Sequence, residues 1–182
     1  GLSAMKALSA PFGSIKFMPT GGINAQNLGE YISAPFIHAV GGSWLCTRGD
    51  IAAGNFDRIT ELCREARKTV LGFELAHVGL NAESEESALA VCGKLSSAFG
   101  FETKNGSSSC FAGSGVEVMK TPYHGVHGHI AIRTNSVARA TAELEKRGFA
   151  LDAASAKYKG DTVTAVYLRG DFGGSAVHLL QK

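Results

Sequence analysis

The sequence predicts an α+β protein in which two βαβββ modules follow a shorter α/β segment. Residues 71–182 contain the order strand–helix–strand–strand–strand twice. Both predicted helices end at a glycine in a similar sequence, Phe99-Gly100-Phe101 and Arg147-Gly148-Phe149. In residues 1–70, apolar runs alternate with helical patterns over short connections, which is typical of parallel strands with helical crossovers. The chain has 182 residues, whereas a complete eight-stranded α/β barrel takes about 250. A whole barrel beside the two modules is therefore excluded.

Residues 1–70 are expected to hold two strands and two helices. Ile15–Met18 and Phe36–Val40 are short apolar runs that each end in a glycine turn. Asn24 is placed to cap a helix over about Ala25–Ser33, and residues Asp57–Val70 repeat apolar side chains at helical spacing. Two strands leave edges and apolar faces uncovered. We therefore expect this part to be loosely ordered, to pack on the second domain or to pair with another chain, and we expect a homo-oligomer.

Residues 71–182 are expected to form eight strands and two helices in one curved domain. The first module is predicted to run through a strand at Phe73–Asn81, a helix at Ser84–Phe99 and strands near 101–105, 108–112 and 116–120. The second is predicted to run through a strand at Gly128–Arg133, a helix at Ser136–Arg147 and strands near 149–158, 163–169 and 175–180.

Composition excludes several classes of function. The formal net charge of +2 is too balanced for a nucleic-acid-binding protein. No apolar run reaches the roughly 18 residues of a membrane span, and the N-terminus lacks the order of a signal peptide. We expect a cytoplasmic protein without nucleic-acid or membrane partners. The four cysteines form no CxxC pair, so they are expected to be reduced and buried.

Two glycine turns follow the predicted strands of residues 1–70. Backbone N–H groups in such turns, next to a helix N-terminus, bind anions, and the loops after neighbouring barrel strands commonly build one phosphate site. A double glycine alone also suits any tight turn. Because the two turns occupy successive strand ends, they favour an anion site built from Thr20, Gly21, Gly22, Gly41, Gly42 and Ser43.

Residues 1 to about 70 resemble the last third of the class I 2-keto-3-deoxy-6-phosphogluconate / 4-hydroxy-2-oxoglutarate (KDPG/KHG) aldolases. The resemblance rests on the runs MKALSAPF at Met5–Phe12, KFMPTGGI at Lys16–Ile23 and AVGGSWL at Ala39–Leu45. It implies the last two βα units of a TIM barrel and a carbon–carbon lyase of carbohydrate metabolism. It also implies a keto-acid or phosphorylated sugar-acid substrate, bound by the six turn residues without a cofactor.

The same resemblance implies a Schiff-base lysine on the preceding barrel strand and an acid/base glutamate near the family's N-terminus. This chain begins after both positions, so we expect no catalytic residue for aldol cleavage in it. Lys16 lies on the strand that leads into Pro19-Thr20-Gly21-Gly22, which is not the Schiff-base strand. The parent protein is expected to be an aldolase, and this chain alone is expected to be inactive in aldol cleavage.

Residues 71–182 place four candidate metal ligands at equivalent positions of the two modules. His77 and Glu117 lie in the first and last strands of the first module, and His129 and His178 lie in those of the second. Imidazole and carboxylate groups facing one cleft suit Zn²⁺, Ni²⁺, Mn²⁺ or Fe²⁺ with open coordination positions. A single such histidine is more often a polar residue on a half-buried strand. Matching positions in both modules favour a shared site.

This pattern resembles the vicinal oxygen chelate (glyoxalase-like) superfamily. The resemblance implies one divalent metal ion per cleft, held by these four residues. Three histidines with one glutamate differ from the commoner set of two and two, which leaves the metal and the activity open. His124 and His127 are expected to be loop or cleft-rim residues, and His38 is expected to be structural. The ligand motifs are LAHV at 75–78, GVEV at 115–118, GHIA at 128–131 and AVHL at 176–179.

Three functions remain open from the sequence. The first is the C-terminal part of a KDPG/KHG aldolase that carries such a module, as some bacterial members of the family do. The second is a metal-dependent enzyme or metal-binding module in residues 71–182 that polarises neighbouring oxygens of a small oxo-acid or thiohemiacetal-like substrate, with Glu117 doubling as a base. The third is a non-catalytic assembly or ligand-sensing module.

Overall fold

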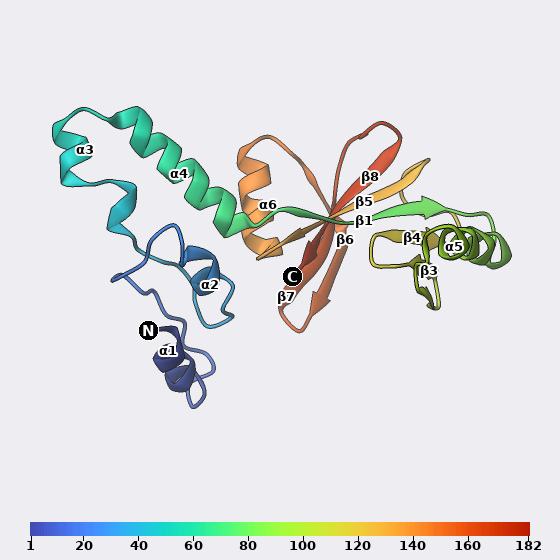
Figure 1. The fold of residues 1–182 in the computed structure, drawn as a ribbon, viewed down its shortest axis with the longest axis horizontal. Coiled ribbons are helices and arrows are strands. Elements are labelled where there is room, and N and C mark those ends of the chain that lie inside the picture. The colour runs from blue at the N-terminus through green and yellow to red at the C-terminus, as the bar shows by residue number, and fades with distance from the viewer. The chain divides into compact units, whose positions relative to one another are not determined.

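The computed structural model describes all 182 residues, which fall into two compact units. Unit 1 comprises Gly1–Gly72 and unit 2 comprises Phe73–Lys182 (Figure 1). Gly72 ends the last helix of unit 1 with a φ of 57°, a left-handed conformation that glycine adopts without a steric penalty. No helix of the chain combines the length and the apolar character needed to cross a bilayer.

Unit 1 is built mainly of helices around a small apolar core. Its buried apolar residues are Ile23, Leu28, Ile32, Ile37 and Leu71. Several large apolar side chains remain exposed, among them Met18, which is 62% exposed. The helices are α1 (Leu2–Ser9), α2 (Leu28–Ile32), α3 (Arg48–Ala52) and α4 (Phe56–Leu71), with a short 3-10 helix η1 (Ser43–Leu45).

The two segments predicted as strands in unit 1 are adjacent and parallel, but they share only one bridge, between Phe17 and Ile37. The Phe17 N–H donates to Phe36 O, and the His38 N–H donates to Phe17 O. Each segment has the other as its only bridge partner, and two strands alone form a weak ladder. The prediction of two full strands, Ile15–Met18 and Phe36–Val40, is therefore wrong in extent although it is right in direction.

The first predicted helix of unit 1 is shorter than expected. Asn24 does not cap helix α2, whose N-cap is Asn27. The Asn24 side-chain oxygen instead accepts the N–H groups of Gln26 and Asn27, so residues 25–27 form a turn and helix α2 begins only at Leu28. The second predicted helix agrees with α4 to within one residue at each end.

Unit 2 is one eight-stranded mixed sheet with two helices (Figure 1). In the spatial order β2-β3-β4-β1-β5-β8-β7-β6, the last strand of each module lies parallel to its first strand. The two first strands, β1 and β5, pair antiparallel at the centre. This order confirms the predicted paired βαβββ architecture. The first module contains β1 (Glu74–Asn81), α5 (Glu85–Phe99), β2 (Thr103–Asn105), β3 (Ser109–Ala112) and β4 (Val116–Met119), and the second contains β5 (Gly128–Thr134), α6 (Val137–Lys146), β6 (Leu151–Lys159), β7 (Thr162–Leu168) and β8 (Ser175–Gln181).

Helix α5 covers one face of the first module and so fixes which side chains face the other way. Ser84 and Ser87 form a reciprocal capping box at its N-terminus. Ala88 and Cys92 of α5 belong to a buried cluster with Cys110 and Val118 of the strands. Because side chains alternate along a strand, a Val118 that faces α5 places its neighbour Glu117 on the opposite face of the sheet.

The cysteines are all free, but only half of them are buried. Cys92 and Cys110 are buried as predicted, whereas Cys46 and Cys63 are exposed. The expectation of four buried thiols is therefore wrong for the two cysteines of unit 1. Its small core half-buries one side of α4, through Ile59 and Leu62, and leaves Cys63 outside.

Candidate metal centre

Four side chains from four strands meet on the sheet face opposite α5. The strand register places Glu117 of β4 beside Gly79 of β1, and Gly79 beside His129 of β5. It also places His77 and His178 on either side of Ala131. Alternation along these strands directs all four side chains to the same face. The residues that the sequence predicted separately, two in each module, are thus brought together at the junction of the modules.

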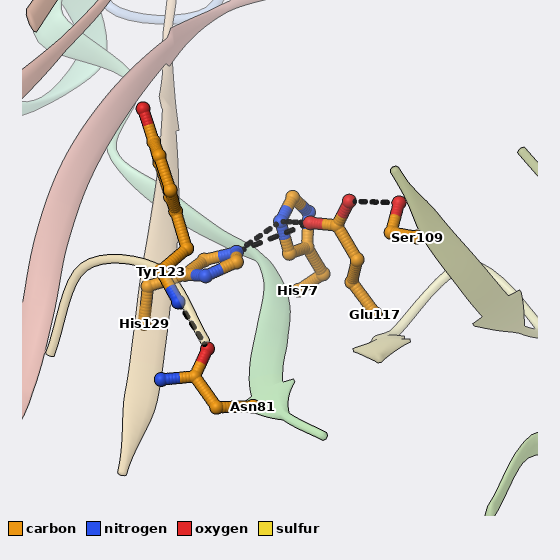
Figure 2. Close-up of polar contacts among 6 residues, drawn as sticks. All are labelled: His77, Asn81, Ser109, Glu117, Tyr123 and His129. Carbon is orange, nitrogen blue, oxygen red and sulfur yellow. Dashed lines mark hydrogen bonds and ion pairs between the residues drawn. The ribbon is translucent and has the colours of Figure 1, made fainter. Parts of the chain in front are cut away.

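Three members of this cluster, Glu117, His77 and His129, have polar atoms within hydrogen-bond distance of one another. Oε2 of Glu117 lies 3.0 Å from Nε2 of His77 and 3.1 Å from Nε2 of His129. The two Nε2 atoms are themselves 3.1 Å apart. Figure 2 shows the carboxylate of Glu117 directed at both imidazoles. One nitrogen each of His77, His129 and His178 lies within 4.8 Å of the others, and all three residues are buried.

Burial and neighbouring groups set the protonation of the cluster. Burial alone would raise the pKa of Glu117, but hydrogen bonds with His129, His77 and Ser109 outweigh it and hold that pKa well below its usual range. Burial, reinforced by His129 and His77, lowers the pKa of His178 to about 3. At neutral pH the cluster therefore offers an ionised carboxylate and a neutral His178 imidazole, whose nitrogen lone pair is available to a cation.

The arrangement fits a divalent metal ion. Ligands bonded tetrahedrally at 2.0–2.1 Å lie about 3.3 Å apart, close to the separations of 3.0 and 3.1 Å among His77, His129 and Glu117. Nε2 of His178 is buried and has no hydrogen-bond partner. A buried unpaired polar atom costs about 1–3 kcal/mol, and a cation would remove that cost. Three imidazoles and one carboxylate form a donor set that Zn²⁺, Ni²⁺, Mn²⁺ and Fe²⁺ all accept.

Residues that the sequence did not predict hold these four side chains in position. The Ser109 hydroxyl donates to Oε1 of Glu117 at 2.6 Å, which leaves Oε2 for the histidines (Figure 2). The ring of Tyr167 stacks on His178 with centroids 4.7 Å apart, and Phe111 meets His77 edge to face at 5.5 Å. Gly79 leaves the space that the His129 ring occupies, since a Cβ there would lie 2.0 Å from Cε1 of His129.

The ring of His129 is held by packing rather than by a hydrogen bond at its far nitrogen. Nδ1 of His129 is buried without a partner, whereas most metal-binding histidines donate this group to a carbonyl or carboxylate. The close approach to Gly79 replaces that restraint. No sequence signal marks Gly79 or Ser109, because their contacts depend on the pairing of β1 with β5 and of β3 with β4.

The other histidines lie outside the cluster. His124 is half-buried, and its ring centroid lies 4.3 Å from those of both Tyr123 and Tyr167. The loop that carries it is fastened by Asn81, which accepts the Tyr123 N–H and donates to Gly125 O (Figure 2). His124 therefore stands at the rim of the site. His38 is exposed in unit 1.

The two glycine turns of unit 1 lie next to each other. The Gly41 N–H donates to Pro19 O, and a Cβ on Gly41 would lie 3.2 Å from the Thr20 methyl group. Gly22 has a φ of 71°, and the Trp44 ring fills the space where a side chain on Gly42 would project. Of the six predicted turn residues, Thr20, Gly21, Gly22 and Ser43 are exposed, and Gly41 and Gly42 are half-buried.

The strand order and the side-chain cluster together define the class of unit 2. It is a two-module βαβββ domain with three histidines and one glutamate at the junction of the modules. The class follows from the topology and the cluster themselves.

Unit 1 matches a known family of enzymes. Residues 1–62 match the family model of KDPG and KHG aldolase, which confirms the resemblance predicted from the sequence. A 2-dehydro-3-deoxy-phosphogluconate aldolase of Pseudoalteromonas atlantica is 48% identical over 66 residues, and one of Dickeya dadantii is 46% identical over 66 residues. The KHG/KDPG aldolase of Escherichia coli is 42% identical over 66 residues. Each match covers 36% of this chain, and the chain spans 31% of the length of these relatives.

Solved structures resemble the chain weakly, over about 60% of its length. A methylmalonyl-CoA epimerase of Streptomyces coelicolor has a TM-score of 0.44 and 16% identity, over 60% of this chain and 94% of that chain. A hypothetical protein from Bacillus halodurans has a TM-score of 0.44 and 14% identity, over 60% and 94%. Likenesses at this level carry no argument about function, and the fold rests on the strand order.

Proposed function

We propose that unit 2 is a divalent-metal centre of the glyoxalase-like kind, with His77, Glu117, His129 and His178 as its ligands. The observation that carries this proposal is the convergence of three imidazoles and one ionised carboxylate, in which Nε2 of His178 is buried without a partner. A bound ion supplies Lewis acidity toward the oxygen atoms of a small substrate such as an oxo-acid. The choice among Zn²⁺, Ni²⁺, Mn²⁺ and Fe²⁺ is left to experiment.

The protein's own groups have distinct roles in this proposal. His178 stays neutral because it is buried, so protons do not compete for its nitrogen near pH 7. Glu117 is fixed through Oε1 by Ser109 and presents Oε2 to the site. As the only carboxylate of the cluster, Glu117 supplies its one negative charge, and its low pKa keeps it ionised as a ligand near neutral pH.

Metal analysis of the purified full chain tests this proposal. A chelator-stripped sample is titrated with Zn²⁺ and with Ni²⁺ while its melting temperature is followed. An ion at 100 times its Kd stabilises the folded state by about 2.7 kcal/mol, which raises the melting temperature of a unit of this size by roughly 10 °C. Glu117→Gln is expected to abolish the rise, and Glu86→Gln, on the exposed first turn of α5, is the matched control. No bound metal and no rise in the wild type would refute the proposal and favour an assembly or ligand-sensing module.

For unit 1 we propose the anion-binding part of a keto-acid aldolase, a lyase of 2-keto-3-deoxy-6-phosphogluconate or 4-hydroxy-2-oxoglutarate. The family match and the adjacent glycine turns support it. The exposed apolar side chains support its association with another chain. Inorganic phosphate is expected to shift the backbone amide resonances of Gly21, Gly22 and Gly42 and to leave those of Gly49 and Gly54 in place. Equal shifts at all five glycines would contradict the proposal.

A further inference from the structure

A cavity of about 330 Å³ opens beside the metal centre, at the end of the second module. The loop between the modules contributes His124 to its wall, β7 contributes Tyr167, and the β7–β8 connection contributes Arg169 and Asp171. Tyr167 is the link to the metal centre, because its ring lines the cavity and also stacks on His178. A ligand in this cavity is thus one aromatic ring away from the metal centre.

The strand register places the polar groups of the cavity on the same sheet face as the metal centre. Tyr167 pairs with His178 on one side and with Asp152 of β6 on the other. Arg169 lies just past the end of β7 and lines the same cavity as Asp152 and Tyr167. Ala176 of β8 lies beside His129 and also lines the cavity.

The charges of the cavity select hydroxyl groups over an anion. Asp152 and Asp171 supply two carboxylates and Arg169 one guanidinium, so the lining has one net negative charge. The guanidinium of Arg169 lies only loosely against Asp152, with Nη2 and Oδ1 3.8 Å apart. Asp171 Oδ1 accepts the Gly174 N–H at 2.7 Å, which leaves Oδ2 as an acceptor.

Hydroxyl groups both donate and accept hydrogen bonds, so neighbouring hydroxyls can satisfy the carboxylates and the guanidinium together. The rings of His124 and Tyr167, with centroids 4.3 Å apart and planes tilted by 43°, add an aromatic wall against which a carbon chain can lie. The net negative charge of the lining opposes an anion, and an apolar chain would form no hydrogen bond with its carboxylates and guanidinium.

We propose that this cavity binds the polyhydroxylated end of a sugar acid whose carboxyl end lies at the metal centre. The inference rests on the proposed metal centre for the acid end, and on the cavity alone for the hydroxylated end. It names Asp152 and Arg169 as the residues that distinguish a sugar acid from a simple hydroxy acid of equal length.

Binding of two matched ligands to the Zn²⁺-loaded full chain tests this assignment. Gluconate and 2-hydroxyhexanoate have the same chain length and the same chelating end, and they differ only in the further hydroxyl groups. Calorimetry is expected to give gluconate roughly tenfold tighter binding, as one or two hydrogen bonds to charged groups would supply. Asp152→Ala and Arg169→Met are each expected to remove most of that difference, whereas Asp161→Ala, on the exposed β6–β7 turn, is expected to keep it. Equal affinities for the two ligands in the wild type would overturn the inference.

Two further samples separate this inference from the proposed metal centre. Sorbitol has hydroxyl groups and no carboxylate, so it is expected to shift the Arg169 side-chain resonance in metal-free protein and to leave that of Arg64 unchanged. A chain that binds no metal but shows this shift would refute the metal centre and retain the cavity assignment. A chain that binds metal but binds 6-amino-2-hydroxyhexanoate more tightly than gluconate would retain the metal centre and show that the cavity selects an ammonium group instead.

Discussion

The substitution Gly79→Ala tests the geometry of the metal centre with one methyl group. A Cβ at this position would lie 2.0 Å from Cε1 of His129, and the Nδ1 and Nε2 atoms would be 2.3 Å away. An ordinary contact begins near 3.4 Å, so the ring must move by 1.4 Å (3.4 minus 2.0). Ligand distances in metal sites are held to within about 0.2 Å, and a displacement this large removes His129 from the site.

We therefore expect Gly79→Ala to weaken metal binding by more than about 100-fold, since even loss of an outer partner of a ligand weakens it 10- to 100-fold. Overpacking of this kind also lowers the free energy of unfolding by about 1–3 kcal/mol. Competition with a chromophoric chelator measures the affinity, and thermal unfolding of the metal-free protein measures the stability.

Gly93→Ala provides the control, because no atom lies within 4 Å of a Cβ at that position of α5. It is expected to leave metal affinity unchanged and to raise stability by up to about 1 kcal/mol through helix propensity. Wild-type metal affinity in Gly79→Ala would refute the reasoning, because it would show that His129 either is not a ligand or does not lie against Gly79.

Three further predictions concern single side chains. Ser109→Ala removes the hydrogen bond that orients Glu117 and is expected to weaken metal binding about 10- to 100-fold without unfolding the chain. Chelator competition measures the affinity, and an unchanged metal affinity would contradict the prediction. The free energy of unfolding of the metal-free protein is expected to fall as the pH drops from about 6.5 to 3. Below pH 6.5, His178 is protonated in the unfolded chain, whereas in the folded chain its pKa of about 3 keeps it neutral. The loss is at most about 5 kcal/mol, at 1.36 kcal/mol for each of the 3.5 pKa units. If a His178→Asn variant loses as much stability as the wild type over this pH range, His178 is excluded as the cause. Lys16 donates from Nζ to Pro35 O in an exposed position, so borohydride with pyruvate is expected to leave it unmodified by mass spectrometry, and a trapped adduct on Lys16 would refute this.

The elements of unit 2 were predictable from the sequence because each local signal agrees with the tertiary structure. Ser84 and Gly100 mark the two ends of α5 in the sequence, and both act as caps. The repeated order of elements gave the module boundaries. Strand ends moved by a few residues, as for β6, which begins at Leu151 rather than at Phe149.

Unit 1 was less predictable because its pattern depends on partners outside the local sequence. An apolar run such as Ile15–Met18 has the composition of a strand, but a strand forms only where a neighbouring ladder satisfies its backbone. Here the neighbour contributes a single bridge at Ile37. Composition also gave no means of distinguishing the exposed Cys63 from the buried Cys92 on another helix.

The four residues of the cluster were predictable, but the residues that position them were not. A histidine on the first strand of each module can be read from the repeat, because strand parity decides which face it takes. The space at Gly79 and the hydrogen bond from Ser109 depend on which strands pair and in what register. A shift of one residue between β1 and β5 would preserve every sequence motif and yet turn His129 away from His77.

This dependence on register means that the metal centre reports on the junction of the modules. His77 and Glu117 come from one module, and His129 and His178 come from the other, while β1 and β5 form the pair that joins them. Without a cation, the junction holds a half-buried carboxylate and Nε2 of His178, which is buried without a partner, and each such group opposes burial. A bound cation would convert these unfavourable groups into bonds across the junction. Metal binding should therefore stabilise the pairing of the modules more than it stabilises either module, and hydrogen exchange should slow most at the β1–β5 amides.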